Sequence, residues 1–132
     1  MTDIAERPTR TSPLTTRQRT ALLAQLQTDR ELTRILIETV SEDMDAFVSA
    51  RRDTATDDEH DPEGPTLAFE RSQSSAILAQ SLQHVAEIDA AFGRMDAGTY
   101  GLCTNCGRDI ALGRLQVRPQ AAHCISCAES LR

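Results

Sequence analysis

The chain has 132 residues and a formal net charge of −6, with one tyrosine, three phenylalanines and no tryptophan. This length suits one domain, and so few aromatic side chains favour elongated helical packing over a large globular core. The acidic balance disfavours general attraction to nucleic acid. No segment approaches the roughly 20 apolar residues of a membrane span, and the first residues lack the apolar core of a secretion signal, so we expect a cytoplasmic protein that does not enter a membrane.

The N-terminal third is predicted to be a short tail followed by one long helix. Residues 1–14 have no apolar period and contain Pro8 and Pro13, so a flexible tail is expected there. Thr15 and Gln18 have the spacing of a capping box, in which each side chain satisfies a free amide at a helix start. Residues 16–52 then contain no proline or glycine, and a helix over them would span roughly 55 Å. Its apolar residues recur at helical intervals: Leu22, Leu23, Leu26, Leu32, Ile35, Leu36, Val40, Met44, Phe47 and Val48.

An acidic loop follows this helix and is expected to form the tip of a hairpin, over residues 57–64. Its carboxylates are Asp57, Asp58, Glu59, Asp61 and Glu63. The order Asp-Pro-Glu-Gly at its end has the residue preferences of a type I turn. An acidic loop of this kind is ordinarily only a solvated turn.

The second arm of the hairpin is predicted from Thr66 to Asp96. Apolar or small residues fall there at alternating spacings of three and four, which is the a/d pattern of a coiled coil, and Leu82 widens the stripe. The members of the pattern are Leu78, Ser81, Val85, Ile88, Phe92 and Met95. We therefore expect an antiparallel two-helix hairpin over residues 15–97, with Gly98 as the C-cap of its second helix.

The four cysteines of the chain lie in two pairs, Cys103-x-x-Cys106 and Cys124-x-x-Cys127, with 17 residues between the pairs. Two such turns facing each other supply the four soft, tetrahedral ligands that structural zinc prefers. We predict one structural zinc ion in a small C-terminal finger, defined here as residues 98–132. Gly107 suits the left-handed turn after the first pair, whereas Ala128 is less suited to the same place after the second.

Other uses of these cysteines are a disulfide pair, an iron site of rubredoxin type and a redox dithiol. A cytosolic chain with two separated Cys-x-x-Cys pairs favours metal over a disulfide. His123 could replace one cysteine, but four thiolates already complete the tetrahedron. A catalytic metal site would need a vacant position, and no nucleophile, base or phosphate loop is evident, so an enzyme is not expected.

Between the two pairs we expect a short β-ribbon, with strands over 109–111 and 114–117, a turn at Gly113 and an extended return at Pro119. Three arginines lie in or beside this segment: Arg108, Arg114 and Arg118. We favour local neutralisation of the charge of a four-thiolate zinc centre as their role, and a phosphate-binding patch is the alternative.

Many fixed positions of the finger resemble those of the DksA/TraR family of bacterial zinc-finger proteins. They are Tyr100, Gly101, Cys103, Cys106, Gly107, Ile110, Arg114, Leu115, Pro119, Cys124 and Cys127. The resemblance implies a mainly α fold, in which an antiparallel coiled coil carries an acidic tip and a four-cysteine zinc finger lies at its base. It also implies a transcription regulator whose tip enters the secondary channel of bacterial RNA polymerase and which does not bind specific DNA sequences. We expect a monomer, although an apolar stripe of this kind can close within one chain or between two.

Two departures from the family pattern bear on function. The family's tip motif is Asp-x-x-Asp-x-Ala, and the nearest equivalent here is Asp58-x-x-Asp61-x-Glu63. Residues 72–93 contain no arginine or lysine, and Ala128 follows Cys127, where the best-known members have basic residues that help to bind the alarmone ppGpp. We therefore expect regulation that does not depend on ppGpp bound at this face of the hairpin.

Two other functions remain open from the sequence. One is a zinc-ribbon adaptor that uses the helical hairpin for protein association without binding polymerase. The other is a nucleic-acid-binding ribbon, which the acidic balance and the lack of stacking aromatic residues disfavour.

Overall fold

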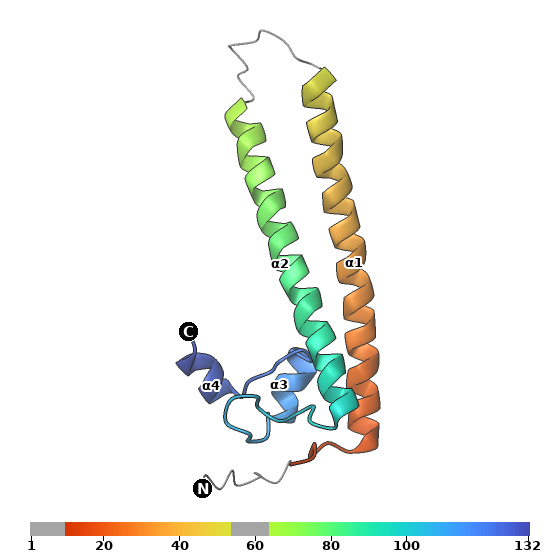
Figure 1. Ribbon diagram of the computed structural model, residues 1–132, viewed down its shortest axis with the longest axis vertical. Helices are drawn as coiled ribbons and strands as arrows, with labels where there is room; N and C mark the ends of the chain where they lie inside the picture. Colours follow the sequence, from red (N-terminus) through yellow and green to blue (C-terminus); the bar gives the residue numbers. More distant parts are fainter. Residues whose placement is uncertain (1–9, 54–63) are drawn as a thin grey trace, which may run out of the picture. The chain divides into compact units, whose positions relative to one another are not determined.

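The computed structural model describes residues 10–53 and 64–132, without the side chains of Phe47 and residues 50–53. Four helices follow one another: α1 (Thr16–Asp53), α2 (Gly64–Ala97), α3 (Leu112–Val117) and α4 (Ile125–Ser130) (Figure 1). The chain forms two compact units. The first contains the beginning of α1, the end of α2 and the finger, over residues 10–28 and 87–132, and the second contains the remainder of the two long helices, within Asp29–Ala86. In the ranges that the structure describes, no helix is long and apolar enough to cross a bilayer.

Helix α1 begins at the predicted capping box. The Gln18 amide N donates to Thr15 Oγ1 (3.1 Å), and the Thr15 amide N donates to Gln18 Oε1 (2.9 Å). Two amide groups that have no partner within the helix are thus satisfied reciprocally. The prediction of one long helix is confirmed, because α1 continues without interruption to Asp53.

Helix α2 starts two residues earlier than expected. Gly64 and Pro65, which we had assigned to the loop, are its first residues. Proline is tolerated in the first turn of a helix, where its missing N–H would have no intrahelical partner. Asp57, Asp58, Glu59, Asp61 and Glu63 lie outside the described residues, as does most of the predicted type I turn.

Gly98 ends α2 as predicted. Its φ of 76° is in the left-handed region. The Gly98 amide donates to Met95 O (3.1 Å), and the Thr99 amide donates to Arg94 O (2.9 Å). This pair of bonds is the Schellman arrangement, which satisfies the last carbonyl groups of a helix and turns the chain away from its axis.

The core of the first unit joins both long helices to the finger. Leu22 and Leu26 of α1 pack with Ile88 and Ala91 of α2 and with a set of finger residues. These finger residues are Tyr100, Cys103, Ile110, Leu115 and Ala121. Four side chains of the unit are fully buried, namely Tyr100, Leu26, Ile88 and Leu115.

Tyr100 is the buried polar group of this core. Its hydroxyl donates to Pro119 O at 2.8 Å. Burial raises the pKa of Tyr100 to about 12, although the positive charge of Arg94 opposes the rise. The Arg94 guanidinium donates to Gln120 O (3.3 Å) and Ala121 O (3.5 Å). The end of α2 is therefore tied to the segment that leads into the second cysteine pair.

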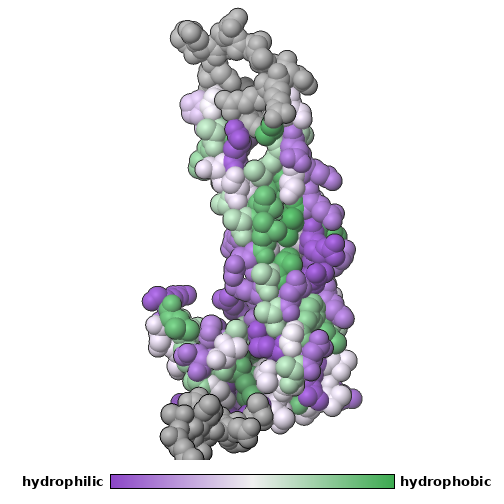
Figure 2. Space-filling view, in the orientation of Figure 1, coloured by the Kyte–Doolittle hydropathy of each residue, from purple (hydrophilic) through white to green (hydrophobic). Residues whose placement is uncertain are grey.

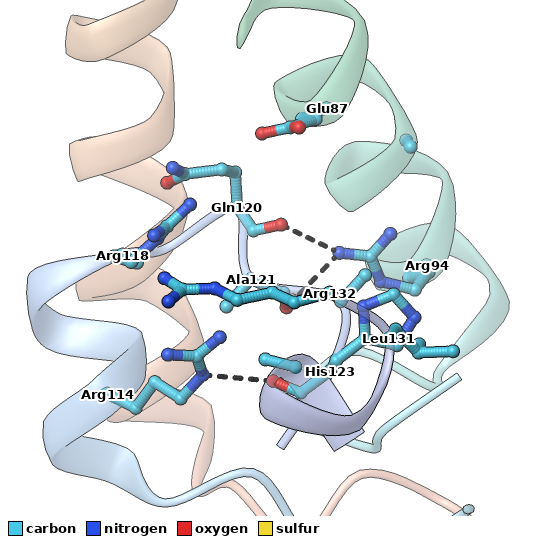
Figure 3. A pocket seen from close by; sticks show the side chains of 12 residues that line it. Glu87, Arg94, Arg114, Arg118, Gln120, Ala121, His123, Leu131 and Arg132 are labelled. Carbon is cyan, nitrogen blue, oxygen red and sulfur yellow. Dashed lines mark hydrogen bonds between the residues drawn. The ribbon is translucent and has the colours of Figure 1, made fainter. Parts of the chain in front are cut away.

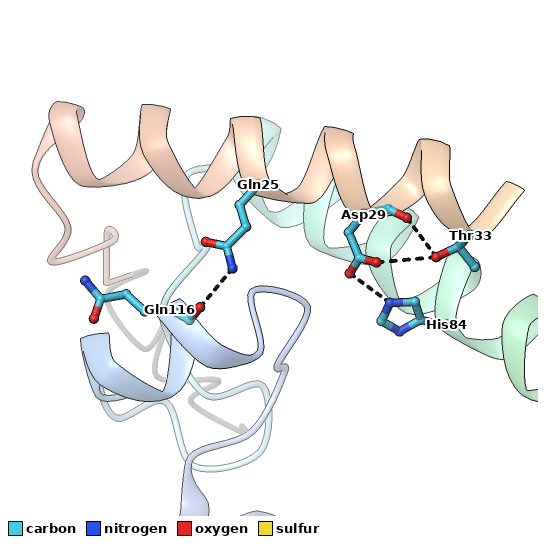
Figure 4. Close-up of polar contacts among 5 residues, drawn as sticks. All are labelled: Gln25, Asp29, Thr33, His84 and Gln116. Atoms are coloured by element: carbon cyan, nitrogen blue, oxygen red, sulfur yellow. Dashed lines mark hydrogen bonds and ion pairs between the residues drawn. The ribbon is translucent and has the colours of Figure 1, made fainter. Parts of the chain in front are cut away.

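The second unit contains a polar layer between the two long helices (Figure 4). Asp29 Oδ2 of α1 lies 2.8 Å from His84 Nε2 of α2. Thr33 Oγ1 donates to Asp29 O (2.7 Å), and Thr33 and Ser81 are both buried. In the first unit Leu26 packs with Ile88, and in the second Asp29 contacts His84, so the pairing runs backwards along α2 as α1 advances. The prediction of an antiparallel hairpin is confirmed.

The apolar stripes were predicted less accurately than the helices. Leu82, expected to widen the stripe of α2, is 52% exposed. Four residues of the expected α1 stripe, Leu32, Ile35, Leu36 and Val48, are also exposed, at 63%, 50%, 44% and 40%. Two helices bury only the surfaces that face each other, whereas the periodicity marks a wider apolar stripe.

The predicted β-ribbon between the cysteine pairs is wrong. The described residues contain no strand, and Leu102 and Asp109 form one isolated antiparallel bridge. Leu112–Val117 is instead the short helix α3, with Gly113 inside it and Leu115 buried. Leu115 packs in the core on one side of this helix, and Arg118, before Pro119, leaves the helical conformation, as a residue before proline tends to do.

Residues 10–14, which we had expected in the flexible tail, pack on the finger. The Ser12 amide donates to Gly98 O at 2.9 Å. Arg10 donates to Gly107 O (3.1 Å) and forms an ion pair with Asp109 Oδ1 (3.0 Å). Leu14 packs against the core, and a Cβ atom at Gly101 would lie 3.1 Å from its Cδ1. The segment has no apolar period because it contributes one apolar side chain and several polar contacts.

We predict that Tyr100→Phe lowers the free energy of unfolding by about 1 to 2 kcal/mol, because Pro119 O loses its donor inside the core. Tyr100→Ala, which also removes the ring, should cost about 3 to 5 kcal/mol. Chemical denaturation of the zinc-loaded chain measures both values. Equal stability of the parent and Tyr100→Phe would show that the 2.8 Å bond contributes nothing.

Candidate metal centre

The two Cys-x-x-Cys pairs of the sequence come together at one point in the structure. Each offers one sulfur, and the four Sγ atoms of Cys103, Cys106, Cys124 and Cys127 all lie within 4.8 Å of one another. Cys106 Sγ and Cys124 Sγ are 3.8 Å apart. A tetrahedron with metal–sulfur bonds of about 2.3 Å has edges of about 3.8 Å, whereas a disulfide bond is about 2.05 Å long. The arrangement suits one tetrahedral metal ion and contains no disulfide.

The first cysteine pair lies on a tight turn closed by backbone hydrogen bonds. The Cys103 amide donates to Arg108 O (2.8 Å), and the Gly107 amide donates to Cys103 O (2.9 Å). Gly107 has a φ of 74°, in the left-handed region. The prediction that glycine is needed directly after Cys106 is confirmed, because a side chain there would be strained.

The second cysteine pair is built differently. Cys124 is the N-cap of α4, and Cys127 lies in its first turn. The Ala128 amide donates to Cys124 O at 2.9 Å, as an ordinary helical residue does. Ala128 is therefore well suited to its position, and our expectation that it should resemble Gly107 was wrong. Here a helix start, and not a left-handed turn, brings the two sulfurs together.

Hydrogen bonds join the two halves of the site to each other. Thr104 donates to Ala122 O through both its amide (2.8 Å) and its hydroxyl (3.1 Å). Asn105 Nδ2 donates to Cys127 Sγ at 3.4 Å. Both residues lie between the first two cysteines, and both contact the second half. The sequence gives no sign of these ties, because they depend on how the two turns face each other.

The local environment shifts the pKa values of two of the cysteine thiols, those of Cys103 and Cys127, in opposite directions. Burial alone would raise the pKa of Cys103, but hydrogen bonds from the backbone N–H groups of Cys106, Cys124 and Asn105 outweigh it and lower that pKa to about 6. For Cys127, the hydrogen bond from Asn105 favours the thiolate, but the neighbouring cysteine sulfurs and desolvation together raise the pKa to about 11. Metal coordination would deprotonate all four thiols.

Charged groups near the centre have partners within the first unit. Asp109 pairs with Arg10, and Arg114 Nε donates to His123 O at 2.9 Å. His123 thus contributes a backbone carbonyl to the finger, and the cluster of possible metal ligands found in the described ranges contains cysteine alone.

A basic pocket lies beside the centre in the same unit (Figure 3). It is a cavity of about 550 Å³ with four arginines and one glutamate in its lining: Arg94, Arg114, Arg118, Arg132 and Glu87. The prediction that regulation does not depend on ppGpp rested on residues 72–93, which lack arginine and lysine. The arginines of the pocket lie outside that range, at the end of α2, in the segment of α3 and at Arg132. Tertiary structure gathers them from positions that no local pattern connects. Independence of ppGpp stays a prediction.

Comparison with known proteins agrees with this geometry. Residues 98–131 match the prokaryotic dksA/traR C4-type zinc finger. The chain is 42% identical over 45 residues to an uncharacterised protein of Aquifex aeolicus (strain VF5), over 34% of this chain and 31% of that protein. It is 39% identical over 41 residues to the RNA polymerase-binding transcription factor DksA of Haemophilus influenzae, over 31% of this chain and 28% of that protein. The matches thus span less than a third of the length of these relatives.

The similarity of the fold extends further than that of the sequence. The structure of transcription factor DksA2 from Pseudomonas aeruginosa matches with a TM-score of 0.66 and 26% sequence identity. This match covers 88% of the present chain and 84% of that chain. With four cysteines placed for one metal ion in a C4-type zinc finger, the cofactor is a single structural zinc ion.

We predict that Cys106→Ser loses most of the bound zinc and loosens the core of the first unit, because metal-binding energy is folding energy in a site this small. Ser126→Ala, which changes an exposed residue between the last two cysteines, is the matched control and should keep one zinc per chain. Elemental analysis under reducing conditions and circular dichroism measure the two effects. Less than about half an equivalent of zinc in the parent, with its thiols intact, would contradict a zinc site.

Asn105→Ala should keep one zinc per chain but bind it about tenfold more weakly, because its amide orients and stabilises the Cys127 thiolate. Competition with a zinc chelator of known affinity measures the change. An unaltered affinity would mean that the 3.4 Å contact does not support the ligand.

Proposed function

We propose that this chain, which belongs to the DksA/TraR family of C4-type zinc-finger proteins, is a transcription regulator that binds bacterial RNA polymerase directly. In this proposal the hairpin inserts its acidic tip into the secondary channel and modulates initiation. Cys103, Cys106, Cys124 and Cys127 hold the zinc ion, and Asp57, Asp58, Glu59, Asp61 and Glu63 form the tip.

The observation that carries the proposal is the match of the whole fold to transcription factor DksA2, over 88% of this chain. A zinc finger alone would be compatible with many functions. Here it follows two long antiparallel helices in the chain. The relative from Haemophilus influenzae, whose similarity is confined to 41 residues, is itself named as a polymerase-binding transcription factor.

A role in binding, not in catalysis, suits the metal centre. Four thiolates would complete the coordination of zinc, which leaves no position for a water molecule or substrate. The ion would fix the geometry of the first unit, and the acidic residues would act at the other end of the two helices. In a narrow channel, carboxylates could repel nucleotide phosphates, pair with basic groups or approach the catalytic magnesium.

The tip is where this sequence departs from the family pattern, with Glu63 in place of alanine in Asp58-x-x-Asp61-x-Glu63. We propose that the two aspartates remain the active groups. Glu63 then adds a third carboxylate to the motif, which increases the negative charge carried into the channel.

We predict that Asp58→Asn combined with Asp61→Asn changes the lifetime of promoter complexes much more than the affinity for polymerase. The reason is that the carboxylates act at the tip, while the stem and the finger provide the docking surface. Glu38→Gln combined with Asp45→Asn removes two exposed carboxylates from α1 and is the control for net charge. Affinity and promoter-complex lifetime should be compared in one buffer, because salt screens these contacts.

Two results would contradict the proposal. If the tip variant alters promoter-complex lifetime as the parent does, the acidic loop is only a solvated turn. If neither the parent nor the control binds polymerase, and a pull-down from bacterial lysate recovers other proteins, the adaptor function replaces the regulator.

A further inference from the structure

The finger has a second cavity, which adjoins the basic pocket and which we call the apolar groove. It has a volume of about 500 Å³ and is lined mainly by the segment of α3 and the start of α4. The largest apolar side chains in its lining are those of Val117 and Ile125, which are 81% and 61% exposed. In the space-filling view, patches of hydrophobic surface lie beside hydrophilic ones on the finger (Figure 2). An exposed apolar groove of this kind is typical of an interaction site.

Two arginines line both cavities. Arg114 and Arg118 belong to the lining of the apolar groove and to that of the basic pocket. They lie one helical turn apart, and the Arg118 amide donates to Arg114 O at 2.7 Å. Val117 is three residues from Arg114, so these three residues share one side of α3, whereas Leu115 packs in the core. The two cavities therefore form one continuous surface, which is apolar on one side of the arginines and basic on the other.

The arginines on this surface have N–H groups to spare. Each guanidinium carries five N–H donors. Arg94 and Arg114 donate to backbone carbonyl oxygens, which are neutral acceptors. Figure 3 shows no hydrogen bond from the exposed Arg118 to another residue of the pocket. Several charged donors are therefore available to an anionic group from outside the finger.

The metal centre does not account for the positive charge of the basic pocket. No cysteine is among the residues that line it, so the pocket is not turned toward the thiolates. Four arginines line it against one carboxylate, that of Glu87. Such an excess of positive charge attracts an anion, and guanidinium groups bind carboxylates through paired, charge-assisted hydrogen bonds.

The adjoining apolar groove favours a protein segment over a nucleotide as the occupant. The lining of the groove contains no aromatic ring on which a base could stack, and its exposed side chains are aliphatic. Glu87 in the basic pocket opposes a ligand that gathers several negative charges at one point. A single carboxylate beside an apolar side chain matches both cavities.

We infer that an acidic segment of RNA polymerase docks on this surface. One of its apolar side chains fills the apolar groove between Val117 and Ile125, and a neighbouring carboxylate pairs with Arg114 and Arg118. The inference rests on the proposed function and names the part of the finger that would contact polymerase. Because the chain as a whole has a net charge of −6, the attraction of an acidic segment would be local to these arginines.

The test is the affinity of the full, zinc-loaded chain for RNA polymerase at low and at high salt, without added nucleotide. The groove variant is Val117→Gln combined with Ile125→Gln, and its control is Val117→Leu combined with Ile125→Val, which keeps the surface apolar. The charge variant is Arg118→Gln. Its control is Arg108→Gln, at an exposed arginine of the finger that lines neither cavity. Helix content and bound zinc, measured for each variant, separate a lost contact from a lost fold.

The groove variant should bind polymerase about tenfold more weakly at both salt concentrations, because salt does not screen an apolar contact. The charge variant should bind more weakly at low salt and differ less from the parent at high salt, because salt screens its lost ion pair. Both controls should bind as the parent does. A photocrosslinking side chain in place of Val117 should attach to a polymerase segment that contains aspartate or glutamate.

The outcomes separate this inference from the proposed function. If the parent binds polymerase and either the groove variant or the charge variant binds as tightly, the inference is overturned and the proposed function stands. The same holds if Arg108→Gln loses as much affinity as Arg118→Gln, or if the crosslinked segment has no carboxylate. A charge variant that binds more weakly only when ppGpp is added would assign the pocket to a nucleotide and also overturn the inference. A parent that does not bind polymerase overturns both.

Discussion

The constraint on which the first unit depends is the meeting of four cysteine sulfurs at one point. The buried side chains of the finger, Tyr100, Ile110 and Leu115 among them, share one core with α1 and α2, so the backbone around the cysteines needs an additional source of order. Two different local structures meet this need, namely a left-handed turn at Gly107 and the start of α4 at Cys124. Thr104 and Asn105 connect them across the site. Zinc would therefore join these two local structures through one shared ion.

The metal centre is connected to the hairpin through Tyr100 and Arg94. Tyr100 fills the space between the ends of the long helices and the finger, and its hydroxyl satisfies a carbonyl of the segment before the second cysteine pair. Arg94, at the end of α2, donates to carbonyls of the same segment. The orientation of the second pair and the end of the helix are therefore coupled. Loss of the metal should therefore loosen the packing of the helix ends. Loss of packing at Tyr100 should weaken metal binding by the cysteines.

The second unit is held together in a different way. Its interface includes a polar layer of Asp29, Thr33, Ser81 and His84. Such a layer contributes less to stability than leucine would, but it favours one register, because a shift along either helix would leave Asp29 or His84 without its partner. Apolar side chains outside this two-helix interface, such as Leu32 and Leu36, are exposed.

The sequence by itself determined the elements whose cause is local. Each of these elements depends on residues that are close in the chain, so each was predicted correctly. They are the capping box at Thr15 and Gln18, the uninterrupted helical run after it, the C-cap at Gly98 and the paired cysteine spacing.

Tertiary structure decided the features that depend on residues distant in the chain. Leu112–Val117 became a helix because Leu115 packs in the core formed by the ends of α1 and α2. Residues 10–14 became ordered because Gly98 and Asp109 offer them partners. The arginines of the basic pocket come from three separate segments. The periodicity of the sequence showed where the apolar stripe of each helix lies. Only the pairing of the helices decided which residues of the stripe are buried, because two helices have too little facing surface to cover them all.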